Sequence, residues 1–282
     1  MKLNLDQKKR NAVKVSLRYM CVFAFVAAMI LPLLWIFLTS IKTNPQAAAV
    51  PPLWIFEPDW THYEGILFST KFNLRNAFIN SLIVTFGTTV LSLLLSFPAA
   101  YSISRFNTGG KNLSYWILSF RMLPPIVFII PMFVVFFTLN LLDTHIGLII
   151  LYLIFNIPLA VWILKSFIEE LPRDFEEAAM VDGCTRIGAM LRVALPLTTP
   201  GIVTTAIMCF FFSFNEFLFA YVFTRERAIT MPAMAAVFIT QYTWLWADLC
   251  ASMILMMMPM VIFAFLIQKR LVRGLTMGAL KA

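Results

Sequence analysis

The sequence predicts an all-α membrane protein with six transmembrane helices. Hydrophobic residues make up 61% of the 282 positions and charged residues only 13%, whereas about a quarter of the residues in a soluble domain are charged. So many apolar side chains do not fit inside one water-soluble core, which leaves lipid as the solvent for much of the surface. The apolar runs are continuous rather than alternating, and this favours helices over the strands of a membrane barrel.

Six stretches reach the roughly 20 apolar residues that a helix needs to cross a bilayer. They are Tyr19–Ser40, Phe78–Ser104, Tyr115–Leu139, Gly147–Leu164, Gly201–Phe223 and Leu249–Ile267. Several contain prolines, namely Pro98, Pro124, Pro125, Pro131 and Pro158, and neighbouring helices are expected to satisfy the backbone groups that these residues free. The first stretch follows a basic N-terminus, as in a signal peptide. It exceeds the roughly 7 to 15 residues of a signal's apolar region, so we expect it to be retained.

Lysine and arginine are unevenly distributed over the two sides of the predicted membrane domain. With the N-terminus inside, the inner segments hold 16 of the 22 basic residues and the outer segments hold five. Cytoplasmic segments of membrane proteins carry such an excess. The bias therefore predicts that both termini are cytoplasmic, and it accounts for the net charge of +8 without a nucleic-acid ligand.

Several sequence features argue against catalysis, metal binding and ion-driven transport. The four cysteines are scattered without CxxC or CxxH spacing, so we expect no metal site. Gly110-Lys111 is followed by Asn112, and no glycine stands five positions before Gly110, so a phosphate-binding P-loop is absent. We expect no enzymatic activity and no cofactor. A secondary transporter or channel driven by an ion gradient is the alternative, and the lack of internal repeats counts against it.

The segment Lys165–Pro200, between the fourth and fifth stretches, is predicted to form two short helices joined by a turn. Pro172 can start a helix, and the acidic residues after it favour the positive end of that helix. Gly183 is expected to end it in the left-handed conformation, and a second helix is predicted from about Thr185. This pattern leaves two interpretations open. One is a knuckle that docks into a groove on a soluble partner, and the other is an amphipathic hairpin resting on lipid headgroups.

The same segment closely resembles the EAA loop of bacterial ABC importer permeases. Glu177-Ala178-Ala179 is followed after three residues by Gly183, and after nine more by Val193-Ala194-Leu195-Pro196. The family pattern is EAA, three residues, Gly, nine residues and I-x-L-P, so Val193 in place of Ile is a mild departure. In that family the loop docks on the ATPase subunit. The resemblance implies an ATPase-coupling role for Glu177, Ala178, Ala179, Asp182, Gly183, Leu195 and Pro196.

Other segments resemble the carbohydrate-importer branch of that family, in particular the smaller permease of maltose-type systems. They are Asn76–Ser81, Leu142-Asp143-Thr144 with Gly147-Leu148, Phe214-Asn215-Glu216-Phe217 with Phe214 in place of Trp, and the tail Arg273–Lys281. The resemblance covers roughly Arg75–Ala282. It implies an N-terminal part at 1–75 with the first helix, a permease core at 76–270 with the EAA loop at 165–200, and a cytoplasmic tail at 271–282.

This resemblance also implies a fold, a location and a set of partners. The fold is the type I ABC importer permease fold, and the location is the bacterial cytoplasmic membrane. The partners are a homologous second permease subunit, two cytoplasmic ATPase subunits and an extracytoplasmic solute-binding protein. The substrate class is a sugar or polyol, and ATP is hydrolysed by the ATPase subunits.

Few polar groups lie inside the predicted helices. Asn215 and Glu216 are the candidates for the translocation path, where the carboxylate would accept hydrogen bonds from substrate hydroxyls. The alternative for Glu216 is a structural bond to a neighbouring helix, formed through Asn215. Arg121 is expected to snorkel to the interface. The other polar side chains, Asn80, Ser81, Ser92, Ser96, Asn156 and Ser213, are expected to pack helices against one another.

Overall fold

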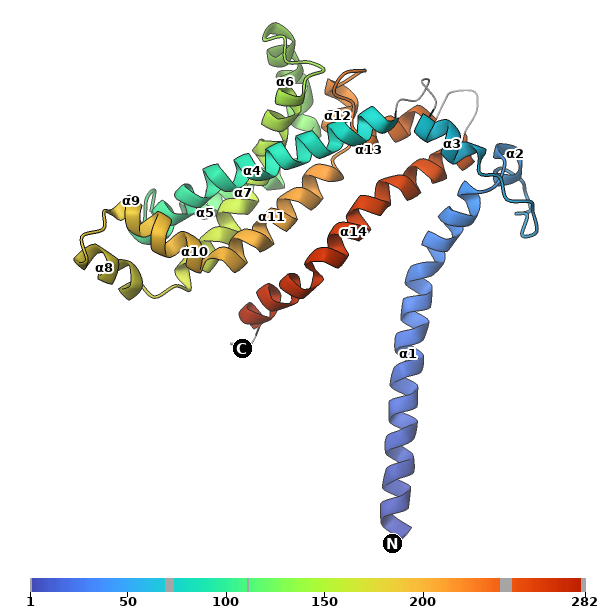
Figure 1. The fold of residues 1–282 in the computed structure, drawn as a ribbon, viewed down its shortest axis with the longest axis horizontal. Coiled ribbons are helices and arrows are strands. Elements are labelled where there is room, and N and C mark those ends of the chain that lie inside the picture. The colour runs from blue at the N-terminus through green and yellow to red at the C-terminus, as the bar shows by residue number, and fades with distance from the viewer. Residues whose placement is uncertain (1, 69–73, 111, 239–244, 280–282) are drawn as a thin grey trace. The chain divides into compact units, whose positions relative to one another are not determined.

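The computed structural model describes residues 2–68, 74–110, 112–238 and 245–279, and these residues contain helices but no strand (Figure 1). The all-α prediction is therefore confirmed for the described part of the chain. The chain divides into two compact units, one of Met1–Ser69 with Phe238–Leu255, and one of Thr70–Val237 with Met256–Ala282. Residues 280–282 of the predicted tail lie outside the described residues, and residues 271–279 continue the last helix.

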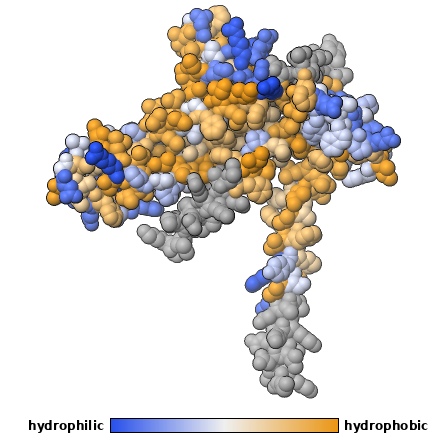
Figure 2. Space-filling model, viewed as in Figure 1, coloured by the Kyte–Doolittle hydropathy of each residue, from blue (hydrophilic) through white to orange (hydrophobic). Residues whose placement is uncertain are grey.

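Four helices in the described part of the chain are long and apolar enough to cross a membrane. They are α1 (Lys2–Ser40), α4 (Leu74–Phe106), α7 (His145–Glu169) and α14 (Trp246–Ala279). These four contain the first, second, fourth and sixth predicted stretches. In α1, every side chain from Lys14 to Trp35 is exposed, and Figure 2 shows the apolar side chains along this helix. That surface is suited to lipid rather than to water.

The third predicted stretch is not one helix. It consists of α5 (Leu113–Ser119), η1 (Phe120–Met122) and α6 (Ile126–Thr138), and the two halves are bent by 91°. Pro124 and Pro125 cause the break because neither has a backbone N–H to donate. Leu123 accordingly takes an extended backbone, with φ −68° and ψ 132°, as residues before proline usually do. Single prolines inside α4, α6 and α7 leave those helices continuous, as predicted.

The fifth predicted stretch is also divided. Helix α11 (Thr199–Phe214) ends before Asn215, and a separate helix, α12 (Leu218–Phe223), begins after Phe217. The short helices α13 (Met231–Ala235) and η3 (Ala236–Phe238) follow. The prediction of a single helix over Gly201–Phe223 is wrong at this point, because the Glu216 carboxylate caps a new helix.

Helices α4, α7 and α11 pack side by side and form the centre of the second unit (Figure 1). The buried face of α4 carries small hydroxyl residues at helical spacing, and such residues let membrane helices approach closely. They are Ser81, Thr85, Thr88, Thr89, Ser92 and Ser96. The predicted packing role of the serines in this set is thus confirmed. Asn80 also joins two helices as predicted, since its Oδ1 lies 2.7 Å from His145 Nε2 of α7, and its Nδ2 donates to the loop carbonyls of Arg227 and Ile229.

The first unit is held together around Asp248, at the start of α14. Its carboxylate accepts a hydrogen bond from Asn44 Nδ2 at 2.8 Å and lies 2.9 Å from Nδ1 of His62. Asn44 belongs to α2 (Asn44–Ala47) and His62 to α3 (Thr61–Phe68). Two short helices after α1 are therefore tied to a helix about two hundred residues later in the chain.

Candidate functional site

The predicted helix–turn–helix segment is present as α8 (Asp174–Val181), α9 (Arg186–Ala189), η2 (Met190–Ala194) and α10 (Leu195–Leu197). We call residues 174–197 the knuckle; it lies at one end of the α4–α7–α11 core, opposite α6 and α12 (Figure 1). Pro172 does not occupy the first helical position, which is Asp174. The π-helical η2 was not predicted from the sequence.

Gly183 ends α8 as predicted, with a positive φ of 90°. Its N–H donates to the carbonyl of Met180 at 3.1 Å, and the N–H of Cys184 donates to the carbonyl of Ala179 at 2.9 Å. These two bonds are those of a Schellman motif, in which a residue in the left-handed conformation closes a helix. A Cβ at Gly183 would meet no atom within 4 Å. The requirement for glycine here is therefore one of backbone conformation and not of space.

The tip of the knuckle exposes apolar side chains. Val181 is 87% exposed and Ile187 is 68% exposed. Among the predicted coupling residues, Glu177, Ala178, Asp182, Gly183 and Pro196 are exposed, while Ala179 and Leu195 are half-buried. Most of the predicted set is thus available to another molecule.

The root of the knuckle is fixed by a buried carboxylate that sequence reasoning did not identify. Glu176 is 6% exposed, and it accepts hydrogen bonds from the Tyr101 hydroxyl at 2.6 Å and from Arg105 Nε at 2.9 Å. Arg105 Nη2 lies 2.7 Å from the same carboxylate and donates to the Leu171 carbonyl at 3.0 Å. Tyr101 and Arg105 stand four residues apart on α4, and that spacing is the only signal of a shared face.

A cavity of about 230 Å³, whose mostly apolar wall contains several polar side chains and is called the polar cavity below, lies deeper in the helical core. It is lined by Arg121, Pro125, Tyr152, Phe155, Asn156, Phe212, Ser213, Glu216 and Phe219. The bend between η1 and α6 places Arg121 here. Its Nη1 donates to the Phe155 carbonyl at 3.0 Å, and its guanidinium lies 4.2 Å from the centre of the Phe212 ring. The expectation that Arg121 snorkels to the interface is therefore wrong, since the side chain is held by α7 and α11.

Glu216 occupies the break between α11 and α12. Its two carboxylate oxygens accept hydrogen bonds from the backbone N–H groups of Phe219 and Ala220, at 3.0 and 3.2 Å. A carboxylate at this place satisfies free N–H groups and favours the positive end of a helix. Glu216 thus has a structural bond, but its partner is the start of α12 and not Asn215.

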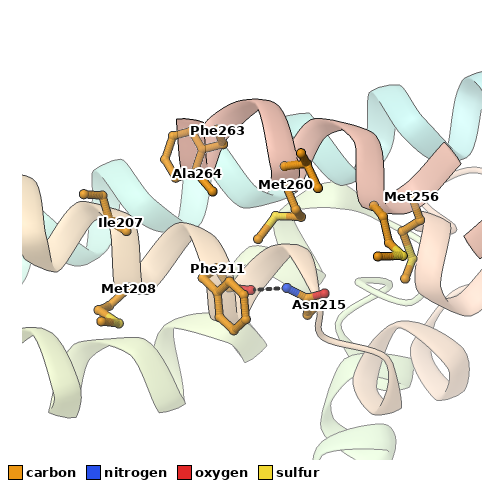
Figure 3. A pocket seen from close by; sticks show the side chains of 10 residues that line it. Ile207, Met208, Phe211, Asn215, Met256, Met260, Phe263 and Ala264 are labelled. Carbon is orange, nitrogen blue, oxygen red and sulfur yellow. Dashed lines mark hydrogen bonds between the residues drawn. The ribbon is translucent and has the colours of Figure 1, made fainter. Parts of the chain in front are cut away.

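Asn215 lies beside a different cavity. That cavity has a volume of about 440 Å³ and apolar walls contributed by α11 and α14, with Met208, Met256 and Met260 among them (Figure 3). The Asn215 Nδ2 donates to the carbonyl of Phe211 at 2.9 Å. The two path candidates, adjacent in sequence, therefore line separate cavities.

Asp143 connects two loops at the end of the core opposite the knuckle. Its carboxylate accepts hydrogen bonds from the backbone N–H groups of Arg225, Glu226, Arg227 and Ala228 at 3.0 to 3.2 Å. Burial by itself would raise the pKa of Asp143, but these N–H groups together hold the pKa below its ordinary value. The turn before α7 is thereby fixed to the loop after α12.

The described residues form an all-helical bundle with an anchored, exposed knuckle at one end. Residues 92–277 match the family described as binding-protein-dependent transport system inner membrane component. The chain belongs to this family, whose members are the permease subunits of ABC importers. It is therefore a permease subunit and not an enzyme, since partner ATPases hydrolyse the ATP.

Individual relatives are similar over nearly their whole length. The trehalose transport system permease protein SugB of Mycobacterium tuberculosis is 36% identical over 263 residues, covering 91% of this chain and 94% of SugB. The sulfoquinovosyl glycerol transport system permease protein SmoH of Agrobacterium fabrum is 34% identical, covering 91% and 93%. The trehalose/maltose transport system permease protein MalG of Thermococcus litoralis is 33% identical, covering 89% and 91%.

The fold is also found in a solved structure. A chain of a bacterial ABC transporter involved in the import of the acidic polysaccharide alginate superposes with a TM-score of 0.72 at 22% identity, covering 90% of this chain and 94% of that chain. This likeness shows that the two share the ABC importer permease fold. The comparisons do not favour the alternative of a transporter or channel driven by an ion gradient.

Proposed function

We propose that this chain forms part of the translocation path of a sugar or polyol importer and is coupled to ATPase subunits through the knuckle. The observation that carries this proposal is an exposed apolar tip on an anchored root. Val181 and Ile187 at the tip suit burial in a groove of a soluble partner. Glu176 at the root fixes α8 to α4 through Arg105. A hairpin resting on lipid headgroups would not need an ion pair to a core helix.

The coupling step in this proposal is a rigid-body displacement. Closure of two ATPase subunits moves the docked knuckle, and the buried carboxylate of Glu176 transmits that movement to α4. Because packed helices have discrete arrangements, a small displacement can switch the path between outward and inward access. Glu177, Ala178, Asp182, Gly183 and Pro196 form the docking surface in this proposal, and Ala179 and Leu195 support it from beneath.

The proposed substrate class rests on the relatives. SugB and MalG are named for trehalose and maltose, and SmoH for sulfoquinovosyl glycerol. All three names describe hydroxyl-rich solutes. A homologous second permease, two ATPases and an extracytoplasmic solute-binding protein complete the proposed importer. Its location would be the bacterial cytoplasmic membrane.

The proposed topology has six spans, formed by the four long helices, by the bent pair α5–α6 and by α11, with the knuckle and both termini in the cytoplasm. The basic residues support this orientation. A cysteine at Asp182 should then react only with thiol reagents that reach the cytoplasm, and one at Thr61 only from outside. Reaction of both from the same side in sealed cells would refute the six-span arrangement.

The experiment that tests coupling changes the knuckle tip. Replacing Val181 and Ile187 by aspartate should release the ATPase subunits that co-purify with the unmodified chain, because charged groups would face an apolar groove. Membrane insertion should persist, since the tip lies outside the spans. Thr138→Ala, at an exposed position at the end of α6, serves as the control. Undiminished retention of the ATPases by the doubly substituted chain would exclude docking through the knuckle.

A further inference from the structure

The polar cavity beside Glu216 contains hydrogen-bonding capacity that the protein itself does not use. The Arg121 guanidinium has five N–H donors. One donates to the Phe155 carbonyl, and in the described part of the chain no carboxylate lies within ion-pair distance of this guanidinium. A guanidinium inside a membrane domain is costly, and the Phe212 ring offsets only part of that cost. Arg121 therefore offers spare donors to a ligand.

Asn156, in the wall of the same cavity, has an unused acceptor. Its side chain is 3% exposed, and its Nδ2 donates to the Tyr152 carbonyl at 2.8 Å and to Ser213 Oγ at 3.1 Å. A carbonyl only accepts hydrogen bonds, so the amide orientation is fixed and Oδ1 points elsewhere. Oδ1 has no hydrogen-bond partner among the described residues. Oδ1 is itself enclosed, but a buried acceptor without a partner is costly, so a hydroxyl group that reached it from the cavity would be favoured.

We infer that this cavity binds a neutral, polyhydroxylated solute between Arg121, Asn156 and Glu216. The inference rests on the proposed function and specifies which groups of this chain recognise the substrate. Arg121 only donates, whereas Asn156 Oδ1 and the Glu216 carboxylate only accept. The Glu216 oxygens take the backbone N–H groups of Phe219 and Ala220, and the Tyr152 hydroxyl also interacts with this carboxylate. Hydroxyl groups both accept and donate, so neighbouring hydroxyls on one ring satisfy all three residues.

Charged solutes fit this arrangement poorly. An anionic group would pair with Arg121 but would be repelled by the nearby Glu216 carboxylate. A cationic group would pair with Glu216 but would be repelled by the Arg121 guanidinium. The aromatic side chains Phe155, Phe212 and Phe219 supply apolar walls for the C–H face of a sugar ring. A volume of about 230 Å³ is below the roughly 300 to 1,000 Å³ of sites for drug-sized ligands. The cavity therefore suits one sugar ring or one part of a longer solute.

A cysteine footprint in the complete transporter tests this site. The four native cysteines are replaced by alanine, and Ser213→Cys places a thiol in the cavity wall with little change in volume. N-ethylmaleimide should label this thiol in the purified complex. Trehalose or sorbitol should slow labelling by the factor 1 + [L]/Kd, reaching about tenfold at ten times Kd. Glucuronate, an anionic sugar, should protect far less.

Two further variants complete the test. Arg121→Met should keep the labelling but abolish the protection by trehalose. Ser166→Ala, on α7 outside the cavity lining, should leave the protection unchanged, because that hydroxyl donates to the Trp162 carbonyl of its own helix, away from the cavity.

Four outcomes would overturn the site. They are a Ser213→Cys thiol that is never labelled, no protection by trehalose or sorbitol, equal protection by glucuronate, and protection that survives Arg121→Met. The footprint needs no ATP, so these outcomes leave the coupling role of the knuckle untouched. Conversely, import that continues without ATP hydrolysis would refute the proposed function, even if the footprint showed that the solute binds.

Discussion

Arg105 and Glu176 form a buried ion pair that joins α4 to the first turn of α8. The guanidinium reaches one carboxylate oxygen from both Nε and Nη2, at 2.9 and 2.7 Å, and both side chains are 7% exposed. Burial of two charges costs desolvation energy, so such a pair adds little net stability. Its geometry nevertheless holds the knuckle in one position against the core.

Removing one partner of this pair should destabilise the protein more than removing both. Glu176→Leu leaves the Arg105 charge buried and unpaired, which should cost about 3–5 kcal/mol. The double variant Arg105→Met/Glu176→Leu replaces the pair by apolar side chains and should regain most of that loss. Thermal unfolding of the purified transporter measures the stability. Transport driven by ATP should stay impaired in both variants, because the rigid connection is gone.

The matched control is the more accessible pair of Lys165 and Glu169 on α7, with side chains 22% and 48% exposed. Lys165→Met should change stability by no more than about 1 kcal/mol and should leave transport intact. Full ATP-driven transport by the stable double variant would show that the Arg105–Glu176 pair is not part of the coupling.

Gly183→Val should damage the knuckle without affecting membrane insertion. A β-branched residue tolerates the φ of +90° poorly, so the end of α8 should shift and the ATPases should be released. Because a Cβ has free space at this position, Gly183→Ala should cost only about 1–2 kcal/mol, and Gly183→Asn less. Uptake and co-purification of the ATPases measure the effect.

Gly110→Val is the control for Gly183→Val, because it introduces similar backbone strain at a position outside the knuckle. Gly110 also has a positive φ, +75°, and open space around its Cβ position, but it lies between α4 and α5. If both valine variants lose the ATPases equally, the effect is general misfolding rather than damage to the docking surface.

Glu216→Gln should alter import affinity while the complex still assembles. One amide oxygen replaces two carboxylate oxygens, so one of the N–H groups of Phe219 and Ala220 loses its acceptor, at a cost of about 1–3 kcal/mol. Asn215→Leu should affect import less, because Asn215 lines the apolar cavity. Uptake kinetics and size-exclusion chromatography of the complex distinguish these results. Dissociation of the Glu216→Gln complex would identify this carboxylate as purely structural.

Asp143→Asn should loosen the loop at residues 225–228. An amide presents one oxygen and an NH₂ group, so it cannot accept from all four backbone N–H groups. Trypsin should cleave after Arg225 and Arg227 several-fold faster than in the unmodified chain. Glu226→Gln removes the same charge from the cleaved loop itself and should change the cleavage rate less than Asp143→Asn does. Equal rates in all three proteins would show that Asp143 does not hold this loop.

The lowered pKa of Asp143 also predicts that the loop at residues 225–228 becomes less stable as the pH falls. A group whose folded pKa is depressed contributes stability that is present above its unfolded pKa, about 3.9, and is lost as the pH falls through the folded value. Hydrogen exchange of the amides at 225–228, corrected for intrinsic rates, should therefore stay slow down to about pH 4 and quicken below it. If hydrogen exchange at these amides became faster already near pH 6, the ionised Asp143 would not be the group that holds the loop.

Prediction from the sequence succeeded where the chemistry is local along the chain. The left-handed Gly183 and the Thr185 cap of α9 follow from residue types at adjacent positions. It failed where the cause was a longer-range partner. Arg121 was expected at the interface, but the bend at Pro124-Pro125 turns it toward Phe155 and Phe212. Asn215 and Glu216 were placed on one path, although the end of α11 directs them to separate cavities.

Composition and apolar run length by themselves determined that this protein is a membrane helical bundle, because lipid selects long apolar helices whatever their partners. The spacing of the EAA segment determined the resemblance that the family match then confirmed. Only the tertiary structure decided which polar groups meet. Tyr101, Arg105 and Glu176 come together, as do Asn156 and Glu216, because the packing of α4, α7 and α11 sets distances between residues that are 50 to 80 positions apart in the sequence. No periodicity along one chain segment encodes such a distance.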